Sequence, residues 1–130
     1  MGKGRMIGLL LAASFAAGNA LAEGDGTPGW AQVSAIFTER CVMCHSQVAG
    51  ASKKLLLDTY AGAMAGSERG TVLIAGDPAG SELMRRLRGE STPRMPFLSR
   101  PLPDAQIVLI EQWIAAGLPE IGEAKWGKRR

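Results

Sequence analysis

Apolar residues recur at helical spacing in the stretch that begins at Trp30. They are three or four positions apart, which places their side chains on one face of a helix. This face is formed by Val33, Ile36, Phe37, Cys41 and Cys44. The pattern predicts a first helix over residues 30–44.

A second helical pattern, near the end of the chain, is the clearest element of the sequence. Pro103 and Asp104 are typical of a helix start, and Gly117 followed by Pro119 is typical of a helix end. The apolar face between them is formed by Ile107, Ile110, Trp113 and Ile114. We expect this last helix to pack against the first one.

Two shorter helices are predicted between these. Asp58 is placed to cap a helix over residues 59–65, and Ser81, after the turn-forming sequence Gly76-Asp77-Pro78, is placed to cap a helix over residues 82–88. In the latter helix two leucines would face inward and three arginines would form a solvated face: Leu83 and Leu87, then Arg85, Arg86 and Arg88. No run of residues alternates long enough to require a sheet, so the predicted fold class is mainly α.

The N-terminal residues have the pattern of a secretory signal peptide. Lys3 and Arg5 precede an uncharged apolar stretch over residues 6–17, and the small-residue tripeptide Ala20-Leu21-Ala22 follows. We therefore expect cleavage after Ala22 and a periplasmic mature protein. The apolar stretch is shorter than the roughly 20 residues that a membrane-spanning helix needs, and no later segment approaches that length. The prediction is no transmembrane segment after signal cleavage.

The expected organisation is a signal peptide (1–22), a short lead (23–29), one helical domain (30–118) and a basic tail (119–130), since the length beyond the signal suits a single core. The formal net charge of the chain is +3. About +1 remains without the two charges of the signal peptide, so we expect no nucleic-acid partner. The basic residues of the tail are Lys125, Lys128, Arg129 and Arg130.

The strongest chemical motif is the pentad Cys41-Val42-Met43-Cys44-His45, which holds both cysteines and the single histidine of the chain. C-x-x-C-H is the attachment motif of c-type haem. Two thiols at this spacing each add to one vinyl group of the porphyrin, and the adjacent histidine then reaches the iron with little orientational freedom left to lose. We predict one covalently bound haem c, attached to Cys41 and Cys44, with its iron ligated by His45.

Three other interpretations of the pentad stay open. A zinc site needs four ligands, so two cysteines and one histidine would require a distant carboxylate. A thioredoxin-like dithiol shares the C-x-x-C spacing but expects a βαβ context, which this sequence does not show. A structural disulfide would leave His45 as an incidental neighbour.

A second histidine ligand from this chain is impossible, because the chain has one histidine, so the sixth position is left to Met, Lys, another weak donor, water or nothing. Met95 is the leading candidate: it lies in Thr92-Pro93-Arg94-Met95-Pro96-Phe97, where the prolines fix φ and reduce the entropy lost when the loop orders. Met43 is too close to His45 to reach around a ring, and the methionines of the two short helices, Met64 and Met84, suit flexible core filler. The alternatives are that Met95 packs on the ring edge or that the iron has five ligands.

Taken in order, these residues resemble the class I cytochromes c, and within that family the short single-haem domains. The likeness covers nearly all of residues 30–117; the pentad is highly specific and the other parts are individually weak. Those parts are Gly76-Asp77-Pro78 with Ser81 and Leu83, Arg94-Met95-Pro96, and Leu102 with Trp113-Ile114-Ala115-Ala116-Gly117. The resemblance implies a cytochrome c-like helical fold around one haem, thioether bonds from Cys41 and Cys44, axial ligation by His45 and Met95, and one-electron transfer. Many members have glycine where this chain has Ser46.

The predicted function is that of an exported electron carrier, not an enzyme, which exchanges single electrons with redox protein partners. Neither a second histidine nor an evident acid-base pair is present for peroxidase-type chemistry. The alternative is a haem-bearing electron-transfer subunit of a larger periplasmic oxidoreductase complex. A third hypothesis, gas sensing at the iron, needs an open or displaceable sixth position.

Overall fold

The computed structural model describes residues 26–123. The predicted signal peptide, its cleavage after Ala22 and the basic residues of the tail lie outside this part. Within it the chain forms four α-helices and one turn of 3-10 helix, with no β-strand, which confirms the mainly α fold class. In chain order these elements are α1 (Trp30–Arg40), η1 (Ser52–Lys54), α2 (Tyr60–Ala65), α3 (Glu82–Arg88) and α4 (Asp104–Ala115).

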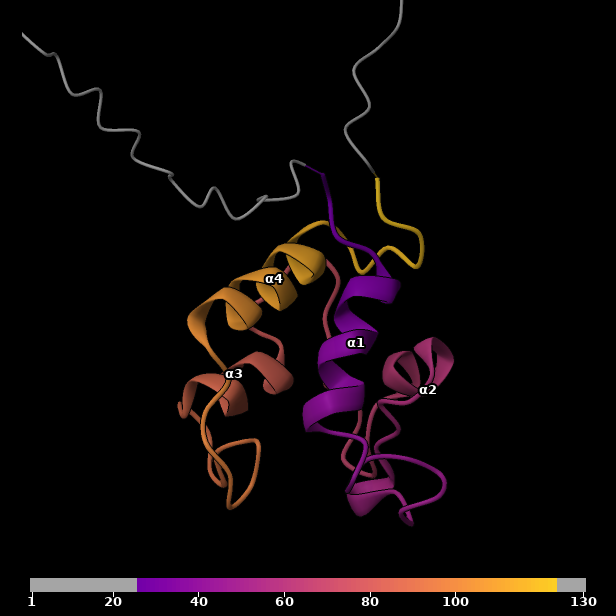
Figure 1. Ribbon diagram of the computed structural model, residues 1–130, viewed down its shortest axis with the longest axis vertical. Helices are drawn as coiled ribbons and strands as arrows, with labels where there is room; N and C mark the ends of the chain where they lie inside the picture. Colours follow the sequence, from indigo (N-terminus) through magenta and orange to yellow (C-terminus); the bar gives the residue numbers. More distant parts are fainter. Residues whose placement is uncertain (1–25, 124–130) are drawn as a thin grey trace, which may run out of the picture.

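The core lies where α1 and α4 pack together, and α3 packs against α4 (Figure 1). The buried residues of the two long helices are those of the predicted apolar faces: Val33, Ile36 and Phe37 in α1, and Ile110, Trp113 and Ile114 in α4. Burial of each such side chain stabilises the fold by roughly 1.5–3 kcal/mol. The predicted contact between the first and last helices is confirmed.

Trp30 links three helices through its indole ring. The ring centroid lies 5.8 Å from that of Phe37 in α1, 5.7 Å from that of Tyr60 in α2 and 5.9 Å from that of Trp113 in α4. The first two contacts are edge-to-face, an arrangement that aromatic rings favour. The start of α1 is therefore fixed against α2 and α4.

The segments before α1 and after α4 also lie together (Figure 1). The Trp30 N–H donates to the Glu120 carbonyl at 3.1 Å, and Trp113 Nε1 donates to the Pro119 carbonyl at 2.9 Å. An isolated antiparallel bridge pairs Thr27 with Glu123. This end of the molecule is closed by contacts between residues far apart in the sequence.

The first helix ends at Arg40, so its predicted extension to residue 44 is wrong. One carbonyl near its end explains the difference. The N–H groups of Cys41 and Val42 both donate to the Phe37 carbonyl, at 2.8 and 3.0 Å. The second bond spans five residues, one more than an α-helix allows, so the chain leaves the helix in a tight turn. The pentad consequently follows the helix instead of forming its last turn.

The predicted cap of α2 is wrong, and that of α3 is right in its position but not in its side-chain bond. Thr59 caps α2, because its Oγ1 accepts from the Gly62 N–H at 3.1 Å, whereas Asp58 accepts from the Gln47 N–H at 3.2 Å. Ser81 precedes α3 but makes no capping bond to it. Its hydroxyl donates to the Asp77 carbonyl and accepts from the Ile74 N–H, both at 2.8 Å, and so closes the preceding turn.

The arginines of α3 form the predicted solvated face only in part, because Arg85 is exposed while Arg86 and Arg88 are partly buried. Arg85 and Arg86 both pair with Glu82, at 2.7 and 2.8 Å, and Arg88 pairs with Glu111 of α4 at 2.7 Å. The side chain of Arg86 is 23% exposed. Two of these ion pairs lie within α3, and the third joins α3 to α4.

None of the helices within residues 26–123 combines the length and the hydropathy needed to cross a membrane.

Candidate functional site

The pentad forms a compact turn directly after α1. The N–H groups of Cys44 and His45 both donate to the Cys41 carbonyl, at 3.1 and 3.0 Å. Cys41 is half-buried and packs against the core, whereas Cys44 is exposed, and both are free thiols. One reversal of the chain therefore presents two thiols and an imidazole within five residues.

The imidazole of His45 is oriented by the backbone of the following loop. His45 Nδ1 lies 3.1 Å from the Ser52 carbonyl oxygen. A carbonyl oxygen only accepts, so Nδ1 carries the proton and Nε2 keeps a free lone pair. Histidines that bind metals are commonly oriented in this way through their second nitrogen. With this tautomer, Nε2 is the His45 nitrogen that is free to bind a metal.

The loop that holds His45 is itself pinned to the pentad. The Ser52 N–H donates to the Cys44 carbonyl at 2.8 Å, and the Leu57 N–H donates to the His45 carbonyl at 2.8 Å. Ser52 is flanked by three residues with left-handed backbone: Ala51 (φ 44°), Lys53 (φ 60°) and Lys54 (φ 57°). For residues other than glycine this conformation costs roughly 1–2 kcal/mol each. The surrounding fold therefore sustains backbone strain around the carbonyl that orients His45.

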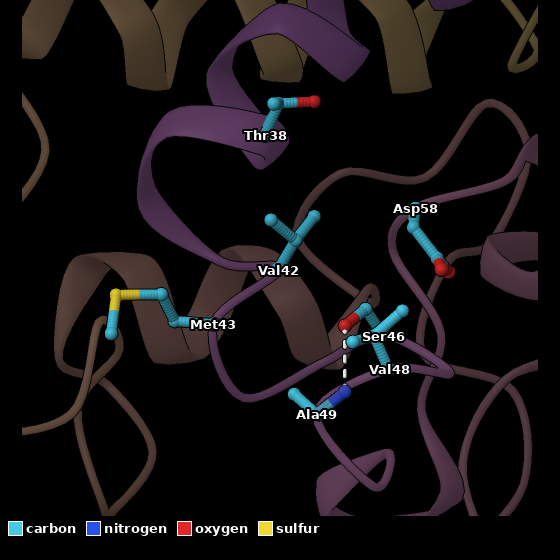
Figure 2. Close-up of a pocket in the computed structure, with 7 residues that line it drawn as sticks. All are labelled: Thr38, Val42, Met43, Ser46, Val48, Ala49 and Asp58. Atoms are coloured by element: carbon cyan, nitrogen blue, oxygen red, sulfur yellow. Dashed lines mark hydrogen bonds between the residues drawn. The ribbon is translucent and has the colours of Figure 1, made fainter.

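A pocket of about 450 Å³ lies beside the pentad (Figure 2). Val42 and Met43, the two residues between the cysteines, line it, but none of the four predicted donors does. The other lining residues are Thr38, Ser46, Val48, Ala49 and Asp58. Ser46, at the position where the resemblance expects glycine, is buried, and its Oγ accepts from the Ala49 N–H at 3.2 Å. The serine hydroxyl thus closes a local turn at the floor of the loop.

Burial raises the pKa of the Cys41 thiol to about 11, an effect that the nearby Arg40 charge opposes and Cys44 reinforces. At neutral pH this thiol is protonated. Dithiol oxidoreductases instead lower the pKa of the attacking cysteine, because the thiolate is the nucleophile. The environment of Cys41 therefore does not suit a thioredoxin-like function.

Met95 lies in the loop between α3 and α4, where the peptide bonds before Pro93 and Pro96 are cis. Its side chain is half-buried and packs against the same core cluster as Cys41. Its N–H donates to the Arg86 carbonyl at 3.0 Å. Met84 is fully buried, Met64 is half-buried against the core, and Met43 is 87% exposed. The predicted donors thus come from two segments, the turn after α1 and the loop after α3, that pack on one core.

Three residues around these segments were not found from the sequence. Ser52 acts through its backbone, which leaves no trace in residue type. Arg86 contacts the Met95 loop, and the only available signal was its spacing of four from Glu82. Arg40, next to Cys41, donates through its guanidinium to the Arg100 carbonyl and so links the end of α1 to the end of that loop.

The donor chemistry of these segments fits a covalently attached haem. Two free thiols, an imidazole with a free Nε2 and a half-buried thioether are the groups that such a haem requires. Large apolar side chains that suit an apolar macrocycle are exposed in the same two segments: Met43 and Val48, then Phe97 and Leu98. Within residues 26–123 no cluster of three or more His, Cys, Asp or Glu is arranged to hold a metal ion, as a zinc site would need.

Comparison with known proteins supports the same conclusion. Residues 41–96 match the family model described as Planctomycete cytochrome C. The match begins at Cys41 and ends one residue after Met95, so it includes all four predicted donors. Searches among curated proteins and among solved structures each found no significant match. A domain of this family suggests haem-based electron transfer, and cytochrome c domains are typically extracytoplasmic. The family match therefore supports a cytochrome c-type domain that includes residues 41–96.

Proposed function

We propose that this protein is an exported single-haem c-type cytochrome that carries single electrons between redox protein partners. Cys41 and Cys44 would hold the haem through thioether bonds, and His45 Nε2 and the Met95 sulfur would be the axial ligands. The observation that carries the proposal is the tight pentad turn in which His45 Nδ1 is committed to the Ser52 carbonyl. A single C-x-x-C-H motif supports a single haem.

When bound, the haem supplies one-electron exchange between ferric and ferrous iron. The residues of the chain set how readily that exchange occurs. A thioether ligand from Met95 favours the ferrous state and raises the reduction potential. Ser52 holds the His45 ring and Arg86 holds the Met95 backbone, so these two residues would keep their places while they hold the haem. A site with both axial residues fixed in this way suits electron transfer better than substrate turnover.

The chain also offers little for acid-base catalysis at this site. His45 is its only histidine, and in the proposed site it would bind the iron. Peroxidase-type chemistry uses a general base within hydrogen-bond reach of the reacting group. An electron carrier requires no such group, which favours this function over an enzymatic one.

Attachment is tested by the intact mass and the alkaline pyridine spectrum of protein made in cells competent for haem attachment. We expect the mass of the mature chain, beginning at Glu23, plus one haem. Cys41→Ser should leave one thioether and one unreacted vinyl group, which changes the spectrum, and the double variant with Cys44→Ser should lose covalent haem. Ser46→Gly, outside the donor set, should attach haem normally. Recovery of only the bare polypeptide mass would refute the proposal.

Axial ligation is tested with Met95→Ala and with Met64→Ala as a matched control for a half-buried methionine. Met95→Ala should abolish the weak far-red absorption band of thioether ligation and lower the reduction potential, and Met64→Ala should change neither. If the band persists without Met95, the ligand assignment is wrong. Carbon monoxide binding to the reduced native protein would instead favour gas sensing.

The carrier function is separated from a subunit function by purification under mild conditions. A monomer that exchanges electrons with unrelated donors supports a free carrier. Stable co-purification with a dehydrogenase would support the alternative of a subunit in a larger oxidoreductase.

A further inference from the structure

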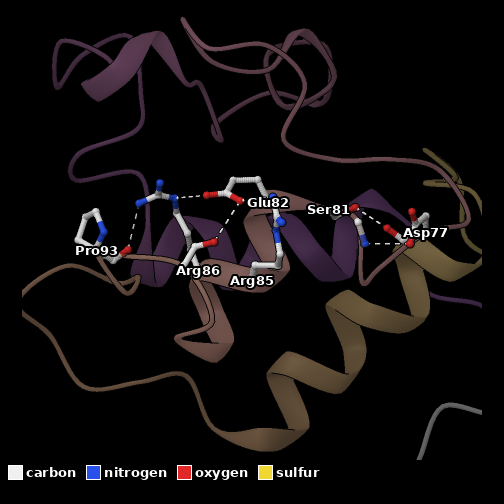
Figure 3. A network of polar contacts seen from close by, with 8 residues as sticks. Asp77, Ser81, Glu82, Arg85, Arg86 and Pro93 are labelled. Atoms are coloured by element: carbon white, nitrogen blue, oxygen red, sulfur yellow. Dashed lines mark hydrogen bonds and ion pairs between the residues drawn. The ribbon is translucent and has the colours of Figure 1, made fainter.

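The loop that carries Met95 is held by one residue of α3 through two different groups. The Arg86 carbonyl accepts from the Met95 N–H at 3.0 Å. Its guanidinium Nη1 donates to the Pro93 carbonyl at 3.2 Å (Figure 3). Two points of the loop, two residues apart, are thereby fixed to the same residue.

The guanidinium of Arg86 is in turn held in place by Glu82. Arg86 Nε donates to Glu82 Oε1 at 2.8 Å, and the other carboxylate oxygen pairs with Arg85 at 2.7 Å (Figure 3). That second oxygen also accepts from Ser91 Oγ at 3.2 Å. The side chains of Arg86 and Glu82 are 23% and 27% exposed. A planar guanidinium that is fixed on one edge presents its remaining donors in a defined direction. The ion pair therefore aims Arg86 at the Pro93 carbonyl.

The geometry points to Arg86 as a positioning residue that holds Met95 in place for iron ligation. This inference rests on the function proposed above. Arg86 need not touch the metal or the haem; it acts by keeping the Pro93 to Met95 segment on α3. Loss of its side chain would leave the Met95 N–H bond but free the Pro93 carbonyl, so the loop would move away from its place more often.

Arg85 provides a matched control. It lies beside Arg86 on α3 and its side chain pairs with the same carboxylate, but within the described structure that side chain makes no hydrogen bond to residues 92–97. The Arg85 carbonyl accepts from the N–H groups of Glu90 and Ser91, and a side-chain substitution leaves these backbone bonds in place. Arg86→Gln and Arg85→Gln therefore remove the same charge and each break one pair with Glu82. Arg86→Lys keeps the charge and the ion pair but lacks the planar fork that reaches both Glu82 and Pro93.

The experiment measures imidazole binding to the ferric holoprotein, the far-red thioether band and hydrogen exchange at the Met95 amide. In Arg86→Gln we expect imidazole to bind about tenfold more tightly, because loss of a charge-assisted hydrogen bond changes such an equilibrium by roughly this factor. The band should weaken, and the Met95 amide should exchange about tenfold faster. Arg86→Lys should resemble Arg86→Gln, and Arg85→Gln should resemble the native protein.

The results that would contradict this role of Arg86 can be told apart from one another. If Arg86→Gln keeps native imidazole affinity and native exchange at Met95, Arg86 does not position the loop. If Arg86→Lys restores native behaviour, or Arg85→Gln matches Arg86→Gln, the effect comes from charge or helix stability and the inference fails. If the native protein has no thioether band, Met95 is not a ligand, and the proposed ligation fails together with this role. Should Arg86→Gln not fold, Glu82→Gln releases the guanidinium and is expected to give the same pattern.

Discussion

The orientation and the tautomer of the His45 ring depend on a single backbone oxygen. The Ser52 carbonyl fixes the proton on Nδ1 and leaves Nε2 as the donor atom. The same residue is bound back to Cys44 through its N–H. The orientation and the tautomer of the ring are therefore set by the loop backbone, so a change in the conformation of residues 51–54 should change the position of the His45 ring.

Ala51 is the residue where this strain is most directly tested. It has left-handed backbone (φ 44°, ψ 70°), which glycine adopts without a Cβ clash. Replacement by glycine relieves about 1 kcal/mol of strain and costs somewhat less in unfolded-chain entropy, so we expect a net gain of about 0.5 kcal/mol. Denaturant unfolding of the holoprotein measures this change in the free energy of unfolding.

Ala49 is the matched control for this prediction. It lies in the same loop and is exposed, but its φ is not in the left-handed region. Ala49→Gly should therefore reduce stability slightly, because only the unfolded state gains freedom. If both glycine variants lose the same amount of unfolding free energy, the backbone of Ala51 is not strained.

The sequence predicted the candidate donors but not what orients them. The pentad is readable because its chemistry needs particular residue types at fixed spacing, and Met95 is readable because prolines surround it. Ser52 is not readable, because it acts through a carbonyl that every residue has. The left-handed conformations of Ala51, Lys53 and Lys54 are equally hidden, since such positions are usually marked by glycine.

At the scale of elements, the sequence located all four helices and missed details at their ends. The last helix was predicted well because apolar periodicity, Pro103 and Gly117 agree on its limits. The first helix was extended too far because Cys41 and Cys44 continue its apolar spacing. Its real end is set by two backbone bonds to one carbonyl, which residue types do not reveal.

The ion pairs of α3 make the stability of this element pH-dependent. Burial alone would raise the pKa of Glu82, but the charges of Arg85 and Arg86 and hydrogen bonds from Arg86 and Ser91 outweigh it and hold the pKa below its ordinary value of 4.5. A carboxyl with a lowered pKa stabilises the folded state above its unfolded pKa. That contribution is lost as the pH falls through the folded pKa.

Glu82→Gln tests whether the Glu82 carboxylate stabilises the folded state at neutral pH and loses this contribution at low pH. The variant should be less stable than the native protein by about 1 kcal/mol at neutral pH, as expected for a partly buried ion pair with several hydrogen bonds. The difference should shrink as the pH falls below 4.5, where the unfolded carboxyl becomes protonated, and should be lost at the lower pH at which the folded carboxyl is protonated as well. Thermal unfolding between pH 3 and pH 7 measures the difference, and a gap that stays constant over this range contradicts the assignment.

At the scale of the whole molecule, the two ends of the described chain meet at the opposite end of α1 from the pentad (Figure 1). Gly29 and Gly122 allow this approach, since a Cβ on Gly29 would collide with the backbone nitrogen of Gly122. Gly29 also caps α1, where its N–H donates to Gln32 Oε1 at 3.0 Å. Its conformation (φ −111°, ψ −174°) is open to any residue, so the requirement for glycine is one of space.

This arrangement predicts that global stability and site chemistry respond separately to changes at Gly29. Gly29→Ala should lower the unfolding free energy by about 1–3 kcal/mol, the usual cost of overpacking. Gly29→Ser adds a favourable helix cap yet meets the same collision, so it should be destabilised to a similar extent. Because the collision lies far from the pentad, the folded fraction of both variants should keep the native reduction potential and far-red band. Recovery of native stability in the serine variant would show that capping, not close packing, decides the residue at this position.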